Sequence, residues 1–404
     1  MPDTRDLRRA LVQRLQRDGH LRSASIAEAM ESVPRELFVP GVPLEDAYRS
    51  SEAIVTKRID GVGVSSASAP DVVALMLEQL DPQPGQRVLE IGAGTGYNAA
   101  LLAHIVGHTG RVVSVDIDED LVEAAREHLA NAGYEWVDVR RADGALGVPD
   151  ENAAFDRIIL TVASRDIAPA WRDQLARPHG RLVLPLSIRG PQRSMAFEPD
   201  GPALTARGVR ACSFIPLRGL LAAPTLRLAL GSHAAISLGL ADDSLPVSPD
   251  RLTAQFLGAR LVQRTGVDSN VIEVRDGLHL WLVAHEPAIC SIWAEASIAA
   301  LPDLFGIPDQ VRAGLGCVAC DGLALLGWSD AGAHAGELCV FAPEAAAASA
   351  ARLLDLVRAW ARSNRPRDAH LTIAAYPREY PFEPAPAAAV VEERWTRFAL
   401  TWSN

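Results

Sequence analysis

The sequence has few cysteines and no long apolar run, and each of these absences excludes a class of protein. Five cysteines among 404 residues are too few for the disulfide framework of a small secreted domain. No uninterrupted apolar stretch approaches the roughly 20 residues that a membrane-spanning helix needs. Residues 1–20 are rich in arginine and aspartate and lack the apolar segment of a secretory signal peptide. We therefore expect a cytoplasmic protein without a membrane partner.

Lysine is also scarce, and the 50 acidic residues outnumber the 39 lysines and arginines. The formal net charge is -11 at pH 7, and the sequence contains a single lysine, Lys57. Such a charge repels phosphate groups overall, so we expect no nucleic-acid partner. A chain of this length has room for two or three domains of ordinary size.

Short apolar runs and amphipathic segments alternate regularly between residues 71 and 185. The patterns predict helices over 71–80, 98–106, 121–132 and 171–175, and strands over 87–91, 111–115, 137–140, 155–160 and 181–185. Strands that alternate with helices at this spacing form a parallel sheet covered on both faces. We therefore predict an α/β fold with a mostly parallel, doubly wound sheet. Residues 41–70, which are rich in glycine and serine, are expected to form a loop.

The regular alternation stops near residue 220. Beyond it the sequence predicts short strands over 277–283, 370–374 and 397–402, together with an alanine-rich helix over 344–361. We therefore predict one domain over residues 1–219 and a second, α+β domain over residues 220–404. The second domain is expected to recognise the substrate.

A glycine-rich loop, Glu90-Ile-Gly92-Ala-Gly94-Thr95-Gly96, follows the first predicted strand of the alternating region and opens a helix. Glycines let the chain turn tightly and let a ligand approach the backbone. Dinucleotide enzymes favour the spacing G-x-G-x-x-G, whereas this loop has G-x-G-x-G with an acid two residues before it. That form is typical of S-adenosylmethionine enzymes, so we favour a methyl donor over NAD. A purely structural turn is the remaining alternative.

Two acids follow the next two strands. Asp116, before Ile117, is expected to accept hydrogen bonds from the ribose hydroxyls of a nucleoside. Asp143, before Gly144, is placed to accept from an adenine amine. Because open α/β sheets bind ligands at the carboxyl ends of their strands, the loop and both acids are expected to share one site. The predicted cofactor-binding residues are Glu90, Gly92, Gly94, Thr95, Gly96, Asp116, Ile117, Asp143 and Gly144.

Residues of about 23–218 resemble the protein-L-isoaspartate O-methyltransferase family. The elements that carry the resemblance are Val33-Pro-Arg-Glu-Leu-Phe-Val39, Ala47-Tyr48, Ser66-Ala-Ser-Ala-Pro70, the glycine-rich loop, Asp143-Gly144, Gln174 to Pro185, and Phe214-Ile-Pro-Leu217. The resemblance implies a Rossmann-like class I methyltransferase domain. It also implies methyl transfer from S-adenosylmethionine to an aspartyl or isoaspartyl carboxylate of a peptide or protein, with S-adenosylhomocysteine as the second product.

The same resemblance assigns a substrate-binding role to Ser68. The family's threonine two residues earlier corresponds to Ser66, which keeps a hydroxyl, and its isoleucine corresponds to Ala67, which removes bulk near the substrate carboxylate. From spacing alone, Ser68 could instead cap a helix that begins near Asp71. The two roles are compatible.

The residues after 220 lie outside this resemblance to ordinary repair enzymes. The extended architecture resembles methyltransferases associated with ribosomally made modified peptides, namely lasso peptides, lanthipeptides and graspetides. Some of these methylate an aspartate so that it closes to an aspartimide. Tailoring of such a peptide is therefore our leading hypothesis. Repair of isoaspartyl residues is the alternative, and a non-catalytic peptide-recognition protein that binds S-adenosylmethionine is a third possibility.

One cysteine pair has the spacing of a metal or redox site. Cys317-Val-Ala-Cys320 could form half of such a site, but no second pair follows at ligand spacing. We interpret both cysteines as buried residues and expect no metal.

Overall fold

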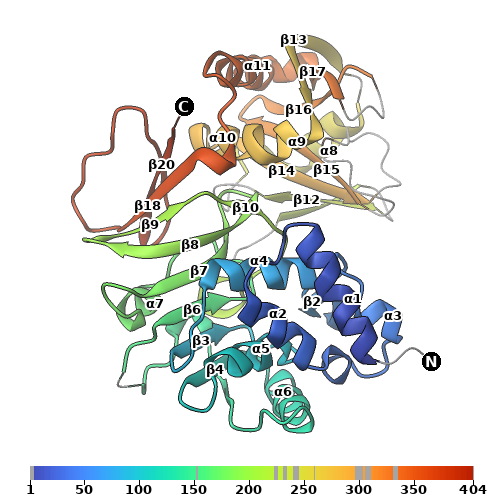
Figure 1. The fold of residues 1–404 in the computed structure, drawn as a ribbon. Helices are drawn as coiled ribbons and strands as arrows, with labels where there is room; N and C mark the ends of the chain where they lie inside the picture. The colour runs from blue at the N-terminus through green and yellow to red at the C-terminus, as the bar shows by residue number, and fades with distance from the viewer. Residues whose placement is uncertain are drawn as a thin grey trace.

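The computed structural model describes residues 4–403 apart from 152, 223–225, 231–233, 240–244, 259, 296–303, 305–310 and 331–334. The described chain forms two large sheets and a separate two-stranded hairpin. The first sheet occupies the lower and left parts of Figure 1, and the second sheet lies above it. Among the described helices, none combines the length and the apolar character needed to cross a membrane.

The N-terminal segment packs as short helices and a hairpin beside the first sheet. Its elements are α1 (Thr4–Arg17), α2 (Ala24–Ser32), the 3-10 turn η1 (Arg35–Phe38), α3 (Leu44–Ala47), β1 (Ile54–Ile59) and β2 (Val62–Ala67). The prediction of a loop over 41–70 is therefore wrong. Most residues of β1 are exposed, so the strand lacks the apolar alternation of a half-buried strand. Its turn, Asp60-Gly61, has positive φ at both residues, as tight hairpin turns require.

The alternating region forms the parallel part of the first sheet. Its elements are α4 (Pro70–Leu80), β3 (Arg87–Ile91), α5 (Tyr97–Val106), β4 (Arg111–Asp116), α6 (Glu119–Asn131), β5 (Asp138–Arg141), the 3-10 turn η2 (Gly144–Leu146), β6 (Arg157–Leu160), α7 (Pro169–Gln174) and β7 (Arg181–Ser187). These five strands are parallel and lie in the order β5-β4-β3-β6-β7. The predicted α/β fold is confirmed.

The sheet then continues with antiparallel strands from the middle and the C-terminal part of the chain. These are β8 (Gln192–Asp200), β9 (Ala203–Arg207), β18 (Leu371–Pro377), β20 (Thr396–Trp402) and β19 (Ala389–Glu392), in that spatial order, with β10 (Arg210–Ala211) pairing with β8. The last strands of the chain thus extend the sheet that residues 87–207 begin. The division at 219/220 stays a prediction about folding units, but it does not separate the two sheets.

The second sheet is antiparallel and is built entirely from residues after 220. The elements of this region are η3 (Gly219–Leu221), β11 (Leu226–Leu230), β12 (Ala234–Gly239), α8 (Pro249–Leu257), β13 (Leu261–Asn270), α9 (Val271–Glu273), η4 (Val274–Leu278), α10 (His279–His285), β14 (Ile289–Glu295), β15 (Val311–Ala319), β16 (Gly322–Trp328), β17 (Ala335–Ala342), η5 (Glu344–Ala346), α11 (Ala347–Arg362) and η6 (Asp368–His370). The strand order is β11-β12-β14-β15-β16-β17-β13.

The strand predicted over 277–283 is wrong, because these residues end η4 and form most of α10. Leu278, Leu280 and Leu282 alternate like strand residues, but the segment is buried on all sides. A fully buried segment has no polar face, so its periodicity does not distinguish a helix from a strand.

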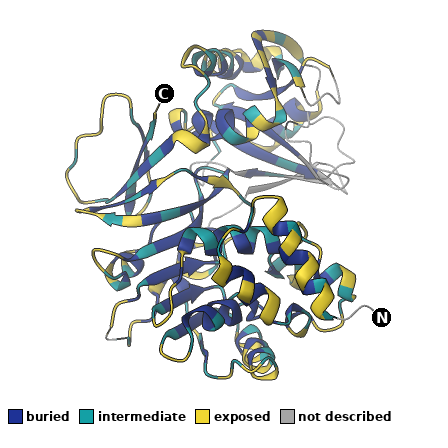
Figure 2. Cartoon of the chain, in the orientation of Figure 1, coloured by how far each residue is buried: buried dark blue, intermediate teal, exposed yellow. Residues whose placement is uncertain are grey.

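Buried side chains on the two faces of the parallel strands belong to different cores. Val88 and Val112 pack with α1, α2, α4 and α5, whereas Leu89 and Val113 belong to a larger cluster. That cluster includes Phe398 near the C-terminus and runs through both halves of the chain. Figure 2 shows the resulting dark strands between helices whose outer faces are exposed. The two halves are therefore joined by a continuous apolar core.

Candidate active site

The carboxyl ends of β3, β4 and β6 and the segment after β5 surround two adjoining pockets. The first, which we call the Asp116 pocket, is lined by Ser66, Gly92, Gly94, Asp116, Ile117 and Gly144 among others. The second, the Glu90 pocket, is lined by Ser66, Ser68, Glu90, Gly94, Thr95 and Tyr97 among others. The structure therefore brings together most residues that the sequence singled out.

The glycine-rich loop needs glycine for two different reasons. Gly92 has φ +102°, and a Cβ atom there would lie 2.6 Å from Thr161 Oγ1. Gly96 has φ +87° at the start of α5, and its Cβ would lie 3.2 Å from the carbonyl oxygen of Ala125. Both positions combine a backbone conformation that favours glycine with a close neighbour. The loop can thus stay tight against the floor of the pockets.

Asp116 fixes this loop and faces the first pocket. Its Oδ2 accepts a hydrogen bond from the Gly94 N–H at 3.0 Å, and its Oδ1 accepts one from the Asp118 N–H at 3.3 Å. Burial raises the pKa of Asp116, although the Gly94 and Asp118 N–H groups oppose that rise. Each carboxylate oxygen has a second lone pair. Asp116 can therefore accept hydrogen bonds from the hydroxyls of a ribose while it holds the loop.

Glu90 is completely buried at the back of the second pocket. Its Oε1 accepts from Asn98 Nδ2 at 2.8 Å, and its Oε2 accepts from the Ser114 hydroxyl at 2.5 Å. Burial raises the pKa of Glu90 to about 7 despite these two hydrogen bonds. A cationic group in the Glu90 pocket would favour the ionised carboxylate.

The Asp143 carboxylate was expected to accept a hydrogen bond from an adenine amine, but the structure gives it two other partners. Its Oδ1 accepts from the Ala145 N–H at 3.0 Å, and its Oδ2 accepts from the Leu220 N–H at 2.8 Å. The carboxylate therefore caps the turn η2 and anchors η3, while the neighbouring Gly144 lines the Asp116 pocket. The sequence could not show this contact because Leu220 lies far along the chain.

Ser66 and Ser68 lie at the mouth of the pockets. Ser66 lines both pockets and also a third, outer cavity that it shares with Ser68 and Phe214. Both serines are half-buried, and no described residue forms a hydrogen bond with either hydroxyl. The residue that caps α4 is Ala69, without a side-chain hydrogen bond, so Ser68 does not cap that helix. Both hydroxyls are thus available to a ligand.

The sequence analysis did not predict two parts of the site, Thr161 and the segment 214–218. Thr161 follows β6, lines both pockets and donates its hydroxyl to the carbonyl oxygen of Gly92 at 2.6 Å. The segment 214–218 lines the same pockets and is held against Ala163 by backbone hydrogen bonds. Thr161 could have been found, because it ends a parallel strand at the same edge as Gly92 and Asp116.

An ion cluster closes the rim of the Asp116 pocket. Asp118 accepts hydrogen bonds from Lys57 Nζ and from Arg218 Nη2, each at 2.7 Å, and Lys57 also contacts Asp120 at 2.7 Å. The cluster links the β1–β2 hairpin, the end of β4 and the segment 214–218. The hydrogen bond from Arg218 is the main reason that the pKa of Asp118 is lowered.

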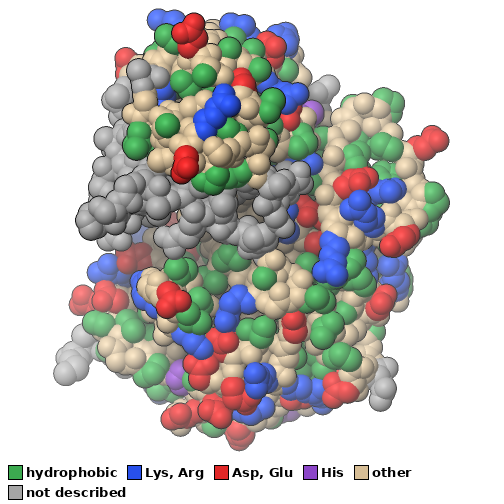
Figure 3. All heavy atoms as spheres, turned by 180° about the vertical axis from the view of Figure 1, so that it is seen from behind, with side chains coloured by type: hydrophobic (Ala, Val, Ile, Leu, Met, Phe, Trp, Pro, Cys, Tyr) green, Lys and Arg blue, Asp and Glu red, His purple; other side chains and the backbone are tan. Residues whose placement is uncertain are grey.

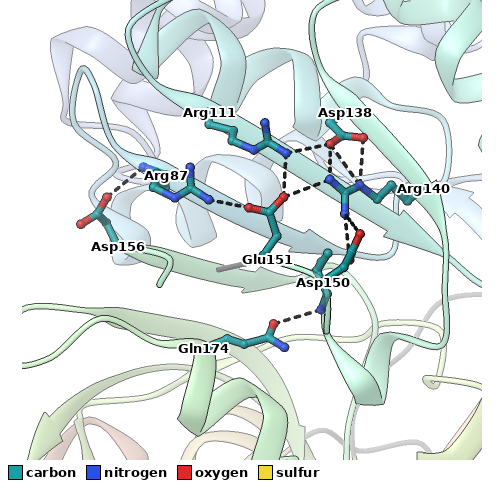
Figure 4. A network of polar contacts seen from close by, with 9 residues as sticks. Arg87, Arg111, Asp138, Arg140, Asp150, Glu151, Asp156 and Gln174 are labelled. Carbon is teal, nitrogen blue, oxygen red and sulfur yellow. Dashed lines mark hydrogen bonds and ion pairs between the residues drawn. The ribbon is translucent and has the colours of Figure 1, made fainter. Parts of the chain in front are cut away.

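A second ion network lies at the opposite, amino edge of the parallel strands (Figure 4). Glu151 accepts hydrogen bonds from Arg87 and Arg111, each at 2.6 Å, and from Arg140 at 3.0 Å. Burial alone would raise the pKa of Glu151, but these three guanidinium groups lower it. Because Arg87 and Arg111 begin β3 and β4, this network ties strand starts together and leaves the carboxyl edge to the pockets.

The cysteine pair of the second half does not form a cluster. Cys317 is buried within β15, and burial raises its pKa to about 12. Cys320 is exposed in the turn that follows, which corrects the expectation that both are buried. Within the described ranges, no group of three or more potential metal ligands comes together.

Comparison with known proteins identifies the family. A family model described as protein-L-isoaspartate(D-aspartate) O-methyltransferase (PCMT) matches residues 6–222, which is more than half of the chain. The chain belongs to the protein-L-isoaspartate O-methyltransferase family. It is therefore a protein carboxyl O-methyltransferase, and the methyl donor of this family is S-adenosylmethionine.

Relatives from archaea share the first half of the chain. The protein-L-isoaspartate O-methyltransferase of Methanopyrus kandleri is 40% identical over 218 residues, which are 53% of this chain and 92% of that protein. The enzyme of the same name from Hyperthermus butylicus is 40% identical over 224 residues, 53% of this chain and 90% of its own. The residues after 222 lie beyond the matched family region.

A solved structure named protein-L-isoaspartate O-methyltransferase resembles nearly the whole chain. It covers 91% of this chain and 96% of its own, with a TM-score of 0.51 and 21% sequence identity. At this identity the similarity shows the fold alone. It shows that an arrangement like this one, second half included, occurs in a protein of that name.

Proposed function

We propose that this enzyme methylates the free carboxylate of an isoaspartyl or aspartyl residue in a polypeptide, which is the α-carboxylate in isoaspartate and the side-chain carboxylate in aspartate. The observation that carries the proposal is the position of Ser66. Ser66 lines both pockets and the outer cavity, which it shares with Ser68. A carboxylate that enters from outside would reach both serines at the point where the Asp116 and Glu90 pockets adjoin.

The chemistry of the two pockets fits the two ends of the methyl donor. We place the adenosine in the Asp116 pocket, where a carboxylate and the backbone of Gly92, Gly94 and Gly144 line the wall. The methionine part then extends into the Glu90 pocket, which offers a buried carboxylate. Asp143 contributes by fixing η2 and η3 through Ala145 and Leu220 rather than by lining a pocket.

The residues at the mouth need only to hold and desolvate the acceptor. Bound S-adenosylmethionine supplies a methyl group on a positively charged sulfur. A carboxylate with a reference pKa near 4 is already ionised at neutral pH, so no general base is needed. The Ser66 and Ser68 hydroxyls can hold one carboxylate oxygen while the other faces the donor, which is catalysis by orientation. Neutral hydroxyls suit this task because a cation would weaken the nucleophile.

The methyl ester formed by the enzyme can react further. The backbone nitrogen that follows the methylated residue can attack the ester carbonyl, methanol leaves, and a five-membered succinimide forms. This step requires no further group from the protein. In an isoaspartyl substrate, hydrolysis of the ring returns part of the material to aspartate.

Two classes of substrate fit this chemistry. Isoaspartyl residues of damaged proteins are the first, and the names of the archaeal relatives support them. An aspartate of a ribosomally made modified peptide, closing to an aspartimide, is the second. The second class rests on the resemblance of the extended chain to methyltransferases associated with such peptides. The second half of the chain does not distinguish the two classes, because a protein named for isoaspartate shares the extended fold.

Methyl transfer to matched peptides tests the proposal. Three peptides of one sequence carry isoaspartate, aspartate or asparagine at one position, and transfer of labelled methyl groups by the full-length protein is measured. Transfer to the isoaspartyl peptide alone indicates repair, whereas transfer to the aspartyl peptide with succinimide as product indicates tailoring. Absence of transfer to both acidic peptides contradicts the proposal.

Variants of the serines localise the activity. The double variant Ser66→Ala/Ser68→Ala is expected to lose most of its transfer rate while it keeps its affinity for S-adenosylhomocysteine. Ser25→Ala is the matched control, because Ser25 is an exposed serine on α2. Unchanged kinetics in the double variant would remove the two serines from the site.

A further inference from the structure

A groove runs along one side of α4 and opens between the two halves of the chain. Two adjoining cavities form it, and both are lined by Gly19 and His20 after α1, by Leu75 of α4 and by Arg210 of β10. On the far side of the wider cavity, the wall comes from the second half of the chain and includes Arg367. In Figure 1 this region lies where β10 passes above α4.

Three arginines from different elements line the narrower cavity without ion-pair partners. Arg22, Arg207 and Arg210 are exposed, and no described carboxylate lies within ion-pair distance of any of them. Glu78, which lines the same cavity, instead accepts the backbone N–H groups of Arg22 at 2.8 Å and Ser23 at 2.6 Å. The narrower cavity therefore offers guanidinium groups whose charge is not neutralised by the protein.

The wider cavity keeps most of its charges paired. Asp276 is bound to Arg275 at 2.7 Å, Asp368 is bound to the buried Arg193 at 2.5 Å, and Glu273 is bound to Arg365 at 3.1 Å. Asp18 is the carboxylate there without a described ion pair. In the narrower cavity, three guanidinium groups without an ion pair thus face one carboxylate, that of Glu78, whereas the lining of the wider cavity adds no excess of positive charge. The narrower cavity is therefore locally positive in a chain whose net charge is -11. On the face shown in Figure 3, acidic side chains gather along the lower edge.

The groove and the outer cavity of the proposed active site are lined by neighbouring residues of the same two segments. Val72, Leu75 and Gln79 have the spacing of one helix face on α4. Val72 lines the outer cavity with Ser66 and Ser68, whereas Leu75 and Gln79 line the arginine-rich cavity. A second segment also lines both cavities. Its residues Arg210 and Ala211 line the groove, and residues 213–216 line the outer cavity.

We propose that this groove binds an acidic segment of the substrate polypeptide beside the methylated residue. The inference rests on the proposed function for the site at its end. Gln79 lies seven positions after Val72 on α4, a rise of about 10 Å, which an extended peptide spans in about three residues. We therefore expect the arginines to contact aspartate or glutamate side chains about three to six positions from the methylated residue.

Peptide binding to the full-length protein saturated with S-adenosylhomocysteine tests this groove. Two peptides share one isoaspartyl or aspartyl residue, and they carry either carboxylates or the corresponding amides at those flanking positions. Binding is measured by calorimetry. The wild type should bind the acidic peptide about tenfold more tightly, because three exposed charge contacts each contribute modestly. The difference should shrink at about 0.5 M salt.

A pair of triple variants separates the groove from general charge effects. Arg22→Gln/Arg207→Gln/Arg210→Gln should bind both peptides with equal affinity. The control Arg9→Gln/Arg264→Gln/Arg362→Gln removes the same charge from three exposed arginines outside the groove and should keep the tenfold difference. Thermal unfolding shows that each variant is folded.

The possible results distinguish failure of the groove proposal from failure of the proposed methyl transfer. Equal affinity of the wild type for both peptides, or a retained difference in the groove variant, overturns the groove proposal while methyl transfer can still occur. Preferential binding of the acidic peptide without methyl transfer supports the groove and contradicts the proposed function.

Discussion

Arg35 donates a hydrogen bond from Nη2 to the carbonyl oxygen of Ser68 at 2.9 Å, and its Nε donates to the carbonyl oxygen of Ala47 at 2.8 Å. The Arg35 side chain is buried, and its guanidinium carbon lies 4.8 Å from the centroid of the Tyr97 ring. Burial lowers the pKa of Arg35, although the guanidinium stays charged at neutral pH. Arg35 therefore positions the backbone of Ser68, the serine proposed to hold the substrate, without lining the outer cavity itself.

Substitution of Arg35 should weaken substrate binding more than donor binding. Arg35→Lys keeps the charge but lacks the planar fork that reaches both carbonyl groups. We expect a rise of about tenfold in KM for the peptide and a loss of stability of about 2 kcal/mol. The affinity for S-adenosylhomocysteine, measured by calorimetry, should change little.

Arg8→Lys is the control for this effect. Arg8 is also buried and donates from Nε to a backbone carbonyl, that of Glu31, at 2.8 Å, but it does not line the pockets. This variant should lose stability without a change in KM. A similar KM in both variants would show that Arg35 is only a structural residue.

Loss of the Asp116 charge should weaken binding of the methyl donor. Asp116→Asn cannot accept hydrogen bonds from Gly94, Asp118 and two ribose hydroxyls together. We expect the affinity for S-adenosylhomocysteine to fall by about 2 kcal/mol, or about thirtyfold, in calorimetry. Asp120→Asn is the matched control, because Asp120 is largely exposed and contacts Lys57. Equal affinities of the two variants would contradict the assignment of the ribose site.

Binding of S-adenosylhomocysteine should depend on pH through Glu90. Its pKa of about 7 means that the buried carboxyl is largely protonated below neutral pH. If the ammonium group of the ligand lies in the Glu90 pocket, it favours the ionised form, so binding at low pH releases a proton. The affinity should therefore rise about tenfold from about pH 6 to about pH 8 and then level off.

The variant Glu90→Gln removes this titration. Its affinity should be lower than that of the wild type at pH 8 and nearly constant across the range. The raised pKa of Glu90 also makes the stability of the wild type depend on pH. The folded protein keeps this proton up to a higher pH than the unfolded chain does. The free energy of unfolding therefore falls as pH rises from 4.5 to about 7. A wild type whose ligand affinity is the same at every pH would place the ammonium group elsewhere.

The buried ion pair between Arg193 and Asp368 should stabilise the contact between the two halves. Arg193 Nε donates to Asp368 Oδ2 at 2.5 Å, and both side chains are almost completely buried. Asp368→Ala leaves a buried guanidinium without its partner, so the free energy of unfolding should fall by about 3–5 kcal/mol in denaturant titration. The double variant Arg193→Met/Asp368→Leu should recover part of this loss. No recovery would show that the pair contributes net stability.

Sequence patterns predicted the parallel sheet well because each of its strands is specified by a short pattern of neighbouring residues. Gly92, Gly94 and Asp116 are placed by the ends of neighbouring strands, and the apolar runs that form those strands are short and clearly bounded. The pockets at this edge therefore follow from the strand order together with the glycine-rich motif. Ser66 and Ser68 were found only through the family resemblance, because Ser66 lies on the short strand β2 and Ser68 just after it, and neither position shows a clear apolar alternation.

The remainder depends on contacts between distant residues. Asp143 turns towards Leu220, and the carbonyl of Ser68 is held by Arg35 from the first helical segment. The α10 helix is buried on all sides, so its sequence resembles a strand. The pairing of β18 with β9 joins residues more than 160 positions apart, as Ala375 opposite Leu204 shows. Local periodicity carries no information about such pairings.

The pairing of β18 with β9 also has a consequence for how the enzyme is made. The ribosome synthesises the methyl-donor pockets early, but the strand that covers the side of β9 emerges only after residue 370. Until then the nascent chain presents an open strand edge, which can pair with other chains. A premature stop between the halves would therefore leave the edge of β9 unpaired in this chain.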